Sequence, residues 1–186
     1  MNREVTSKEA ILQVCRKIAA EQGLSALSTR AVAQACGIAL GTLYHYYSDK
    51  DALLLATVES VWQDIFHRDD AQRGVLPFPE SVTALFHRVR SGTAAYPGFL
   101  AAHSIAIAGS RKGEAKDAME RCFAHMKTEL LGVLRADPQV DREAFSGALT
   151  QASFVDFVVD SLLLLLVKEA PDCEALTTLV RRVIYR

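Results

Sequence analysis

The chain has 186 residues, of which half are apolar and 23% are charged. This is ordinary globular composition, and it argues against a disordered chain. The 21 basic and 22 acidic residues give a formal net charge of −1, so no basic excess points to nucleic acid. The four cysteines are widely spaced, at Cys15, Cys36, Cys122 and Cys173. This spacing fits a reducing compartment better than a disulfide framework or a metal cluster.

Neither a secretory signal nor a membrane span is expected. The first ten residues contain no apolar stretch of the kind that a signal peptide needs. The longest apolar run covers residues 162–167, whereas a membrane-spanning helix needs about 20 residues. We therefore expect a cytoplasmic protein without a membrane partner.

Apolar residues recur at helical spacing along the whole chain, and no stretch alternates with a period of two. The first helix is expected to bury Ile11, Cys15, Ile18 and Ala19 and to stop at Gly23. Further apolar stripes cover residues 54–65, 115–134 and 176–184. Turn-forming residues separate these helices at 74–79, 96–98, 109–113, 137–138 and 171–172. The pattern predicts an all-α protein of about nine helices.

Residues 27–53 carry the clearest functional signal. Ser28 or Thr29 can cap a short helix, and Gly37 follows where a tight turn needs a positive φ. A second short helix is expected over residues 40–46. Two short helices joined by a glycine turn are typical of a helix-turn-helix, which presents its second helix to the DNA major groove.

The side chains of the second helix suit DNA. It displays Thr42, Tyr44, His45 and Tyr46, with Lys50 just beyond. Hydroxyl groups and a lysine suit phosphate oxygens, and Thr42 can meet a base edge or a thymine methyl. A helix–glycine–helix corner also occurs in many helical proteins that do not bind DNA. In that alternative the tyrosines are packing residues, a role that we expect for Tyr47 in either case.

The same segment closely resembles the DNA-binding domain of the TetR family of bacterial transcriptional regulators. The resemblance covers roughly residues 8–55. It rests on residues in register with the family pattern, which are Gly23, Ser28, Arg30, Val32, Ala33, Cys36, Gly37, Ile38, Gly41, Leu43, Tyr44, Tyr47, Lys50 and Leu53.

The resemblance implies a helix-turn-helix DNA-binding domain of three helices at residues 1–50 and an effector-binding and dimerisation domain at residues 51–186. It also implies a homodimer that binds a palindromic double-stranded DNA operator, most often as a repressor, and that a small-molecule effector releases. By the same resemblance, three residues are expected to contact phosphates, namely Ser28, Tyr44 and Lys50. Four are expected to contact bases or backbone, namely Thr29, Arg30, Thr42 and His45.

Two positions depart from the family pattern. Ala39 stands where a serine often caps the recognition helix, and a missing cap costs about 1 kcal/mol of local stability. Leu40 stands where a polar or basic residue is common. It can contact a thymine methyl instead, which would change the preferred operator sequence.

The C-terminal part is expected to pair two subunits. Residues 144–167 are apolar around most of a helix and need cover on nearly all sides, and residues 176–184 offer a second apolar face. In the family, the last two long helices typically form the dimer interface. The alternative is that both helices are intramolecular core. Asp156 and Asp160 are expected to pair with Arg181 and Arg182 at the dimer rim, or alternatively one of these acids faces a cavity and recognises a cationic effector.

An effector cavity is expected among the central helices. Its candidate lining residues are Trp62, Phe66, Phe86, Phe99, His103, Phe123, Met126, Phe154 and Phe157, although each could equally be core. No catalytic, cofactor-binding or metal-ligand motif is present in the sequence, so we expect neither an enzyme nor a cofactor. The alternative to a DNA-binding regulator is a helical module that binds small molecules or proteins and does not read DNA.

Overall fold

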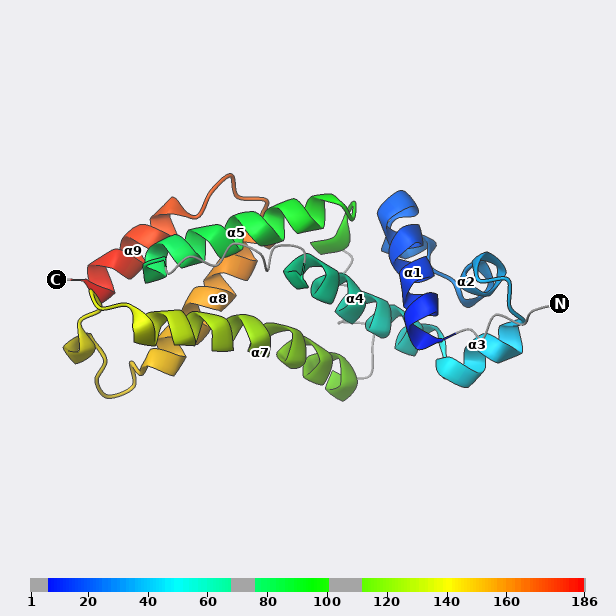
Figure 1. The fold of residues 1–186 in the computed structure, drawn as a ribbon, viewed down its shortest axis with the longest axis horizontal. Helices are drawn as coiled ribbons and strands as arrows, with labels where there is room; N and C mark the ends of the chain where they lie inside the picture. The colour runs from blue at the N-terminus through cyan, green and yellow to red at the C-terminus, as the bar shows by residue number, and fades with distance from the viewer. Residues whose placement is uncertain (1–6, 68–75, 101–111, 186) are drawn as a thin grey trace. The chain divides into compact units, whose positions relative to one another are not determined.

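Every element of secondary structure in the described part of the chain is a helix (Figure 1). The computed structural model describes residues 7–67, 76–100 and 112–185. The α-helices in these ranges are α1 (Lys8–Gln22), α2 (Thr29–Ala35), α3 (Leu40–Tyr46), α4 (Lys50–His67), α5 (Phe78–Ala94), α7 (Lys112–Ala136), α8 (Gln151–Val167) and α9 (Glu174–Ile184). The predicted all-α class is confirmed.

The chain divides into two compact units. Unit 1 combines Met1–Ile65 with Gly92–Met119, and unit 2 combines Phe66–Ser91 with Glu120–Arg186. The division falls inside three helices, α4, α5 and α7. The functional boundary between residues 50 and 51 stays a prediction, and it coincides with the first turn of α4.

Helix α1 begins and ends at its predicted signals. The hydroxyl of Ser7 accepts a hydrogen bond from the Ala10 amide at 3.1 Å. Gly23 follows the helix with a φ of 80°, and its amide donates to the Ala19 carbonyl. The predicted stripe of Ile11, Cys15, Ile18 and Ala19 is buried. These residues form the α1 side of the core of unit 1.

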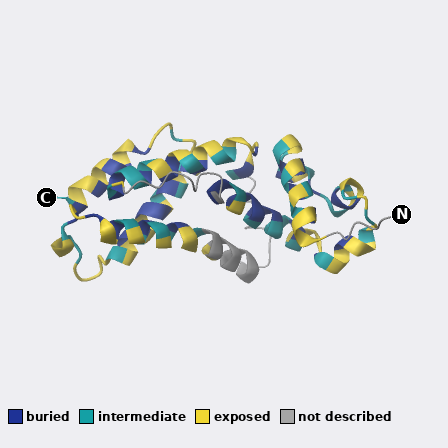
Figure 2. Ribbon diagram, in the orientation of Figure 1, coloured by how far each residue is buried: buried dark blue, intermediate teal, exposed yellow. Residues whose placement is uncertain are grey.

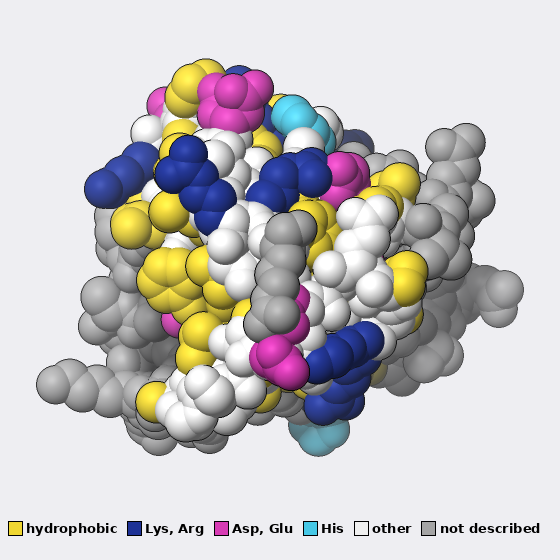
Figure 3. Space-filling view, turned by 90° about the vertical axis from the view of Figure 1, so that its left-hand side faces the viewer, with side chains coloured by type: hydrophobic (Ala, Val, Ile, Leu, Met, Phe, Trp, Pro, Cys, Tyr) yellow, Lys and Arg dark blue, Asp and Glu magenta, His cyan; other side chains and the backbone are white. Residues whose placement is uncertain are grey.

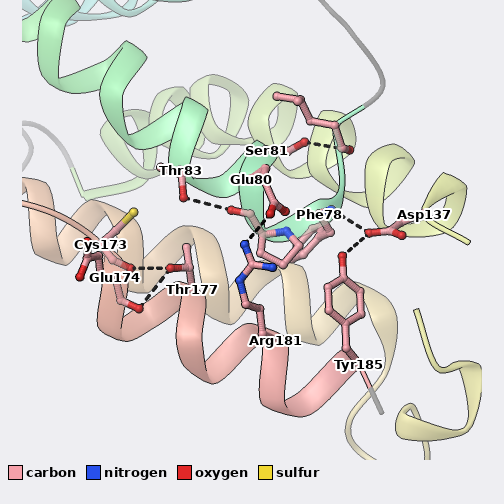
Figure 4. Close-up of polar contacts among 12 residues, drawn as sticks. Phe78, Glu80, Ser81, Thr83, Asp137, Cys173, Glu174, Thr177, Arg181 and Tyr185 are labelled. Atoms are coloured by element: carbon pink, nitrogen blue, oxygen red, sulfur yellow. Dashed lines mark hydrogen bonds and ion pairs between the residues drawn. The ribbon is translucent and has the colours of Figure 1, made fainter. Parts of the chain in front are cut away.

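In unit 2, buried Asp137 joins three helix ends (Figure 4). It follows α7 and accepts hydrogen bonds from the Phe78 amide at 2.8 Å, where α5 begins, and from the Tyr185 hydroxyl at 2.6 Å, after α9 ends. The Gln139 amide donates to its other oxygen at 3.0 Å. Burial alone raises the pKa of Asp137, but these hydrogen bonds and the Arg142 charge together lower it below its ordinary value.

Helix α8 begins later than the apolar stretch 144–167 indicates. Residues Arg142–Ala144 form a short 3-10 helix, and Gly147 then adopts a φ of 58°. Thr150 caps α8 through a reciprocal pair of hydrogen bonds with Ser153. The apolar residues before Thr150 therefore lie outside the helix, because this capping box sets its start.

Within the described single chain, neither Asp156 nor Asp160 pairs with Arg181 or Arg182, and pairing across the expected dimer rim stays a prediction. Asp156 instead pairs with Lys127 of α7 at 3.0 Å, and Arg181 pairs with Glu80 of α5 at 2.5 Å. Both aspartates are exposed on α8, so neither needs a charged partner to offset burial.

Candidate nucleic-acid interface

Helices α2 and α3 form the predicted helix-turn-helix. Ser28 caps α2 by accepting a hydrogen bond from the Ala31 amide at 3.1 Å. Gly37 turns the chain with a φ of 65°, and the Ile38 amide donates to the Ala33 carbonyl at 3.0 Å. Helix α3 then covers the predicted residues Leu40–Tyr46. The positive φ explains the glycine, since a side chain at this position would be strained.

One face of this helix pair packs inward and the other faces solvent (Figure 2). Val32 and Ala33 of α2 and Leu43 of α3 are buried, and so is Tyr47 after α3. The opposite side of α3 exposes the candidate DNA contacts, which are Thr42, Tyr44 and His45, with Tyr46 half-buried. The burial pattern thus leaves the predicted contact side chains on one open surface.

Further candidate residues border this surface. The hydroxyls of Thr29 and Tyr44 lie 3.5 Å apart, so the start of α2 meets the outer side of α3. Arg30 and Lys50 are exposed, and Ser28 is half-buried. Lys50 is the first residue of α4, whose start is fixed by the Asp49 carboxylate accepting from the Ala52 amide at 2.8 Å. The cap therefore holds the base of the Lys50 side chain beside α3.

The start of α3 shows the predicted departures from the family pattern. Ala39 gives no side-chain hydrogen bond to the helix, and Leu40 is half-buried. At Gly41 an added Cβ would meet nothing within 4 Å. The fold of the single chain therefore does not require this glycine, and the space beside it is open to a partner.

Tyr47 gives a stability prediction for this helix pair. In the described part of the chain its phenol oxygen is buried without a hydrogen-bond partner, and burial raises its pKa to about 12. A buried polar group without a partner costs about 1–3 kcal/mol. We expect Tyr47→Phe to raise the free energy of unfolding in urea by about 1 kcal/mol. Tyr185→Phe, which removes a bonded hydroxyl, is the control and should lower it. A destabilised Tyr47→Phe would contradict this account.

The predicted effector residues are divided between the two units. Trp62 and Phe99 lie in unit 1 with their ring centroids 5.4 Å apart. The members in unit 2 are Phe66, Phe86, Phe123, Met126 and Phe154. All of these are buried except Phe123, which is half-buried. Phe157 is 61% exposed on α8 and lies on the surface. His103 lies outside the described residues. A role for this set in effector binding stays a prediction.

Helices α8 and α9 expose large apolar side chains. On α8 these are Phe157, Leu164 and Val167, and on α9 they are Leu179 and Val183. Their exposed fractions range from 40% at Val183 to 61% at Phe157. Figure 3 views the side of the molecule where α9 lies, and hydrophobic side chains appear there on the surface among Lys and Arg. Unlike single exposed residues, a group of this size on two helices is typical of an interaction surface.

Sequence reasoning missed the polar contact that holds α1 against α4. Arg16 donates a hydrogen bond to the hydroxyl of Ser60, which is 2% exposed. The two residues are far apart in sequence and no motif joins them, so periodicity could not find the pair.

In the described ranges, no helix is long and apolar enough to cross a membrane. No group of three potential metal ligands occurs among the described side chains.

The N-terminal part of the chain is similar in sequence to known regulators. Residues 11–57 match the family described as bacterial regulatory proteins, tetR family. The HTH-type transcriptional regulator UidR of Escherichia coli (strain K12) is 36% identical over 52 residues. This match covers 28% of the chain and 26% of UidR. The chain thus spans about a quarter of the length of this relative.

Solved structures share the fold over most of the chain. BioQ, crystallised with its natural double-stranded DNA operator, has a TM-score of 0.68 at 16% identity, covering 96% of this chain and 98% of BioQ. A possible TetR-family regulator from Streptomyces coelicolor A3(2) has a TM-score of 0.56 at 22% identity, covering 84% and 68%. These findings confirm the predicted family resemblance over residues 11–57, and the described chain shares the fold of these two solved structures.

Proposed function

We propose that the protein is a transcriptional regulator that binds a palindromic DNA operator as a homodimer. The observation that carries this proposal is the open side of α3, where Thr42, Tyr44 and His45 are exposed on a helix-turn-helix. A helix exposed in this way fits the major groove, and its neighbours can hold the phosphate backbone on either side. The TetR-type sequence of residues 11–57 supports the same role.

The exposed groups divide by chemistry into two kinds of contact. Ser28, Tyr44 and Lys50 offer hydroxyls or a charge to phosphates, which fix position without reading sequence. Four residues, Thr29, Arg30, Thr42 and His45, are proposed to reach bases or backbone. Leu40 at the start of α3 is proposed to contact a thymine methyl, and Tyr46 to border the interface.

The proposed dimer uses the exposed apolar faces of α8 and α9. Leu176, Val180 and Ile184 of α9 are buried in the single chain, whereas Leu179 and Val183 on the same helix remain exposed. The helix is therefore apolar beyond the side that the single chain covers. A second copy would remove this surface from water, at about 25 cal/mol for each square ångström of apolar area.

We also propose that a mostly apolar small molecule binds among the central helices and weakens DNA binding, as in a repressor. The support is the set of buried aromatic side chains within each unit, such as Trp62 and Phe99 in unit 1 and Phe86 in unit 2. Apolar and aromatic walls are typical of small-molecule sites. A coupling of typical size, 1–3 kcal/mol, would change operator affinity by roughly 5–150-fold.

Two substitutions test the assignment of α3 and its neighbours to DNA. Lys50→Ala should weaken binding to all duplexes about equally and reduce the salt slope by about one, because Lys50 would neutralise one phosphate. Thr42→Ala should instead change base preference, at a cost of roughly 1–3 kcal/mol if it makes a good base contact. Affinities are measured by fluorescence anisotropy on matched and mismatched duplexes. Two variants that bind every duplex as tightly as the unsubstituted protein would contradict the assignment.

A further inference from the structure

A polar contact joins α1 to α4 in unit 1. The Arg16 guanidinium donates to the buried Ser60 hydroxyl and also pairs with Glu9 at 3.0 Å. One turn earlier on α4, the fully buried Thr57 hydroxyl donates to the Leu53 carbonyl at 2.8 Å. No hydroxyl of α4 in this contact is left without a partner. The interface is therefore packed and satisfied, which favours one arrangement of the two helices.

A second set of contacts joins residues 62–65 of α4, the last part of that helix in unit 1, to residues 92–100. The Tyr96 hydroxyl donates to the Asp64 carboxylate at 2.8 Å, and Tyr96 is 4% exposed. The Phe99 ring lies 5.4 Å from the Trp62 ring and 6.1 Å from the Tyr96 ring, centroid to centroid. Residues after α5 are thus tied to α4 by a hydrogen bond and by an aromatic cluster.

Two glycines mark close approaches in the same unit. At Gly92 an added Cβ would lie 2.7 Å from Cγ2 of Ile65, so α5 and α4 meet there with no room for a side chain. At Gly23 an added Cβ would lie 3.6 Å from the Pro97 carbonyl oxygen. The turn after α5 therefore also reaches the residue that ends α1.

We propose that residues 92–100 belong to the same rigid body as the helix-turn-helix, and that the Tyr96–Asp64 hydrogen bond is a tie that holds them there. The inference rests on the proposed DNA binding and adds which other residues move together with the DNA-binding helices. The body that fits the operator then consists of α1–α3, α4 as far as Ile65, and residues 92–100 of the described chain. Any displacement of residues 92–100 would act on α4 at Asp64, Trp62 and Ile65 and on the end of α1 at Gly23.

Amide hydrogen exchange distinguishes this body from a smaller DNA-binding domain. A ligand that binds only the closed form slows every amide that exchanges through opening of the same cooperative unit. With DNA at 100 times its dissociation constant, the slowing is about 100-fold. The Tyr96 and Phe99 amides are hydrogen bonded to the Thr93 and Tyr96 carbonyls, so they can report the opening.

The experiment uses the full chain and a duplex selected from a randomised library by the purified protein. Exchange is followed by mass spectrometry with and without this duplex. We expect residues 92–100 to be slowed by DNA to nearly the same extent as residues 29–46, although we assign no DNA contact to them. In Tyr96→Phe, the slowing at 92–100 should fall at least about 10-fold while that at 29–46 persists. Asp64→Asn keeps an acceptor for Tyr96, so this variant should retain most of the DNA-dependent slowing at residues 92–100.

Tyr185→Phe is the matched control, since it breaks a Tyr–Asp hydrogen bond of similar length in unit 2. It should leave the DNA-dependent slowing of residues 92–100 unchanged. Slowing confined to residues 8–67 would overturn the inference while leaving DNA binding intact. If Tyr96→Phe and Tyr185→Phe reduce the slowing at residues 92–100 equally, the Tyr96–Asp64 hydrogen bond does not hold these residues in the body, and this part of the inference is wrong. Failure to select or bind any duplex would instead contradict the proposed function.

Discussion

Replacing Leu179 by Arg is expected to turn the proposed dimer into monomers and to abolish tight operator binding. Leu179 is 56% exposed in the single chain and lies on the apolar face of α9. In a two-fold interface the substitution is present twice. An unpaired buried charge costs about 3–5 kcal/mol, so two of them raise the dimer dissociation constant by about 10⁴-fold or more.

The measurement is sedimentation at micromolar concentration, with circular dichroism to follow the fold. The single-chain fold should survive because the new guanidinium can extend into water. Leu76→Arg is the matched control, because Leu76 is 45% exposed and lies away from α8 and α9 in sequence. This variant should remain dimeric. A wild-type monomer, or a Leu179→Arg variant that sediments as a dimer, would contradict the proposed interface.

Asp137→Ala is expected to lower the free energy of unfolding by about 3 kcal/mol or more. The substitution leaves two buried or half-buried donors without an acceptor, the Phe78 amide and the Tyr185 hydroxyl. Each donor left unpaired costs about 1–3 kcal/mol, and bonds to a charged acceptor lie at the high end. Because the carboxylate joins the ends of α5, α7 and α9, its loss affects unit 2. Urea unfolding of the full chain measures the effect.

The same carboxylate makes the stability of unit 2 decrease as the pH falls. The pKa of Asp137 is lowered in the folded chain. Its contribution to the free energy of unfolding is therefore fully present above the pKa of the unfolded chain, near pH 4, and is lost as the pH falls through the pKa of the folded chain. Asp137→Asn keeps an acceptor of the same shape and removes the charge. It should cost less than Asp137→Ala and flatten the decline of stability below about pH 4. A decline as steep as that of the unsubstituted protein would show that other carboxyl groups cause it.

The helix-turn-helix could be predicted from the sequence because its signals are local. Ser28 caps the helix that follows it directly, and Gly37 supplies the one positive φ of the turn. Both effects depend on neighbours within a few residues, so the local sequence is enough to predict the bounds of α3. The inward position of Tyr47 also follows from its spacing after Leu43.

The long-range partners could not be predicted in this way. Periodicity shows which side of a helix is buried, but it does not show which helix lies opposite. Asp137 meets Tyr185 across 48 positions, and Arg181 meets Glu80 across 101. Within the chain, the partner of Asp156 is Lys127 of α7, which periodicity could not identify. The start of α8 was missed because Ser153 fills the place where a capping box usually has Glu or Gln.

Salt-dependent DNA binding by the purified protein tests the central claim most directly. The probe is a labelled duplex selected from a randomised library, titrated by fluorescence anisotropy between about 50 and 200 mM salt. We expect saturable binding whose logarithmic association constant falls linearly with the logarithm of salt concentration, by about 0.9 for each phosphate neutralised. The selected sequence should be palindromic, as a two-fold dimer requires. No saturable binding at low salt, or an affinity that does not depend on salt, would contradict the proposal that this helix-turn-helix reads DNA.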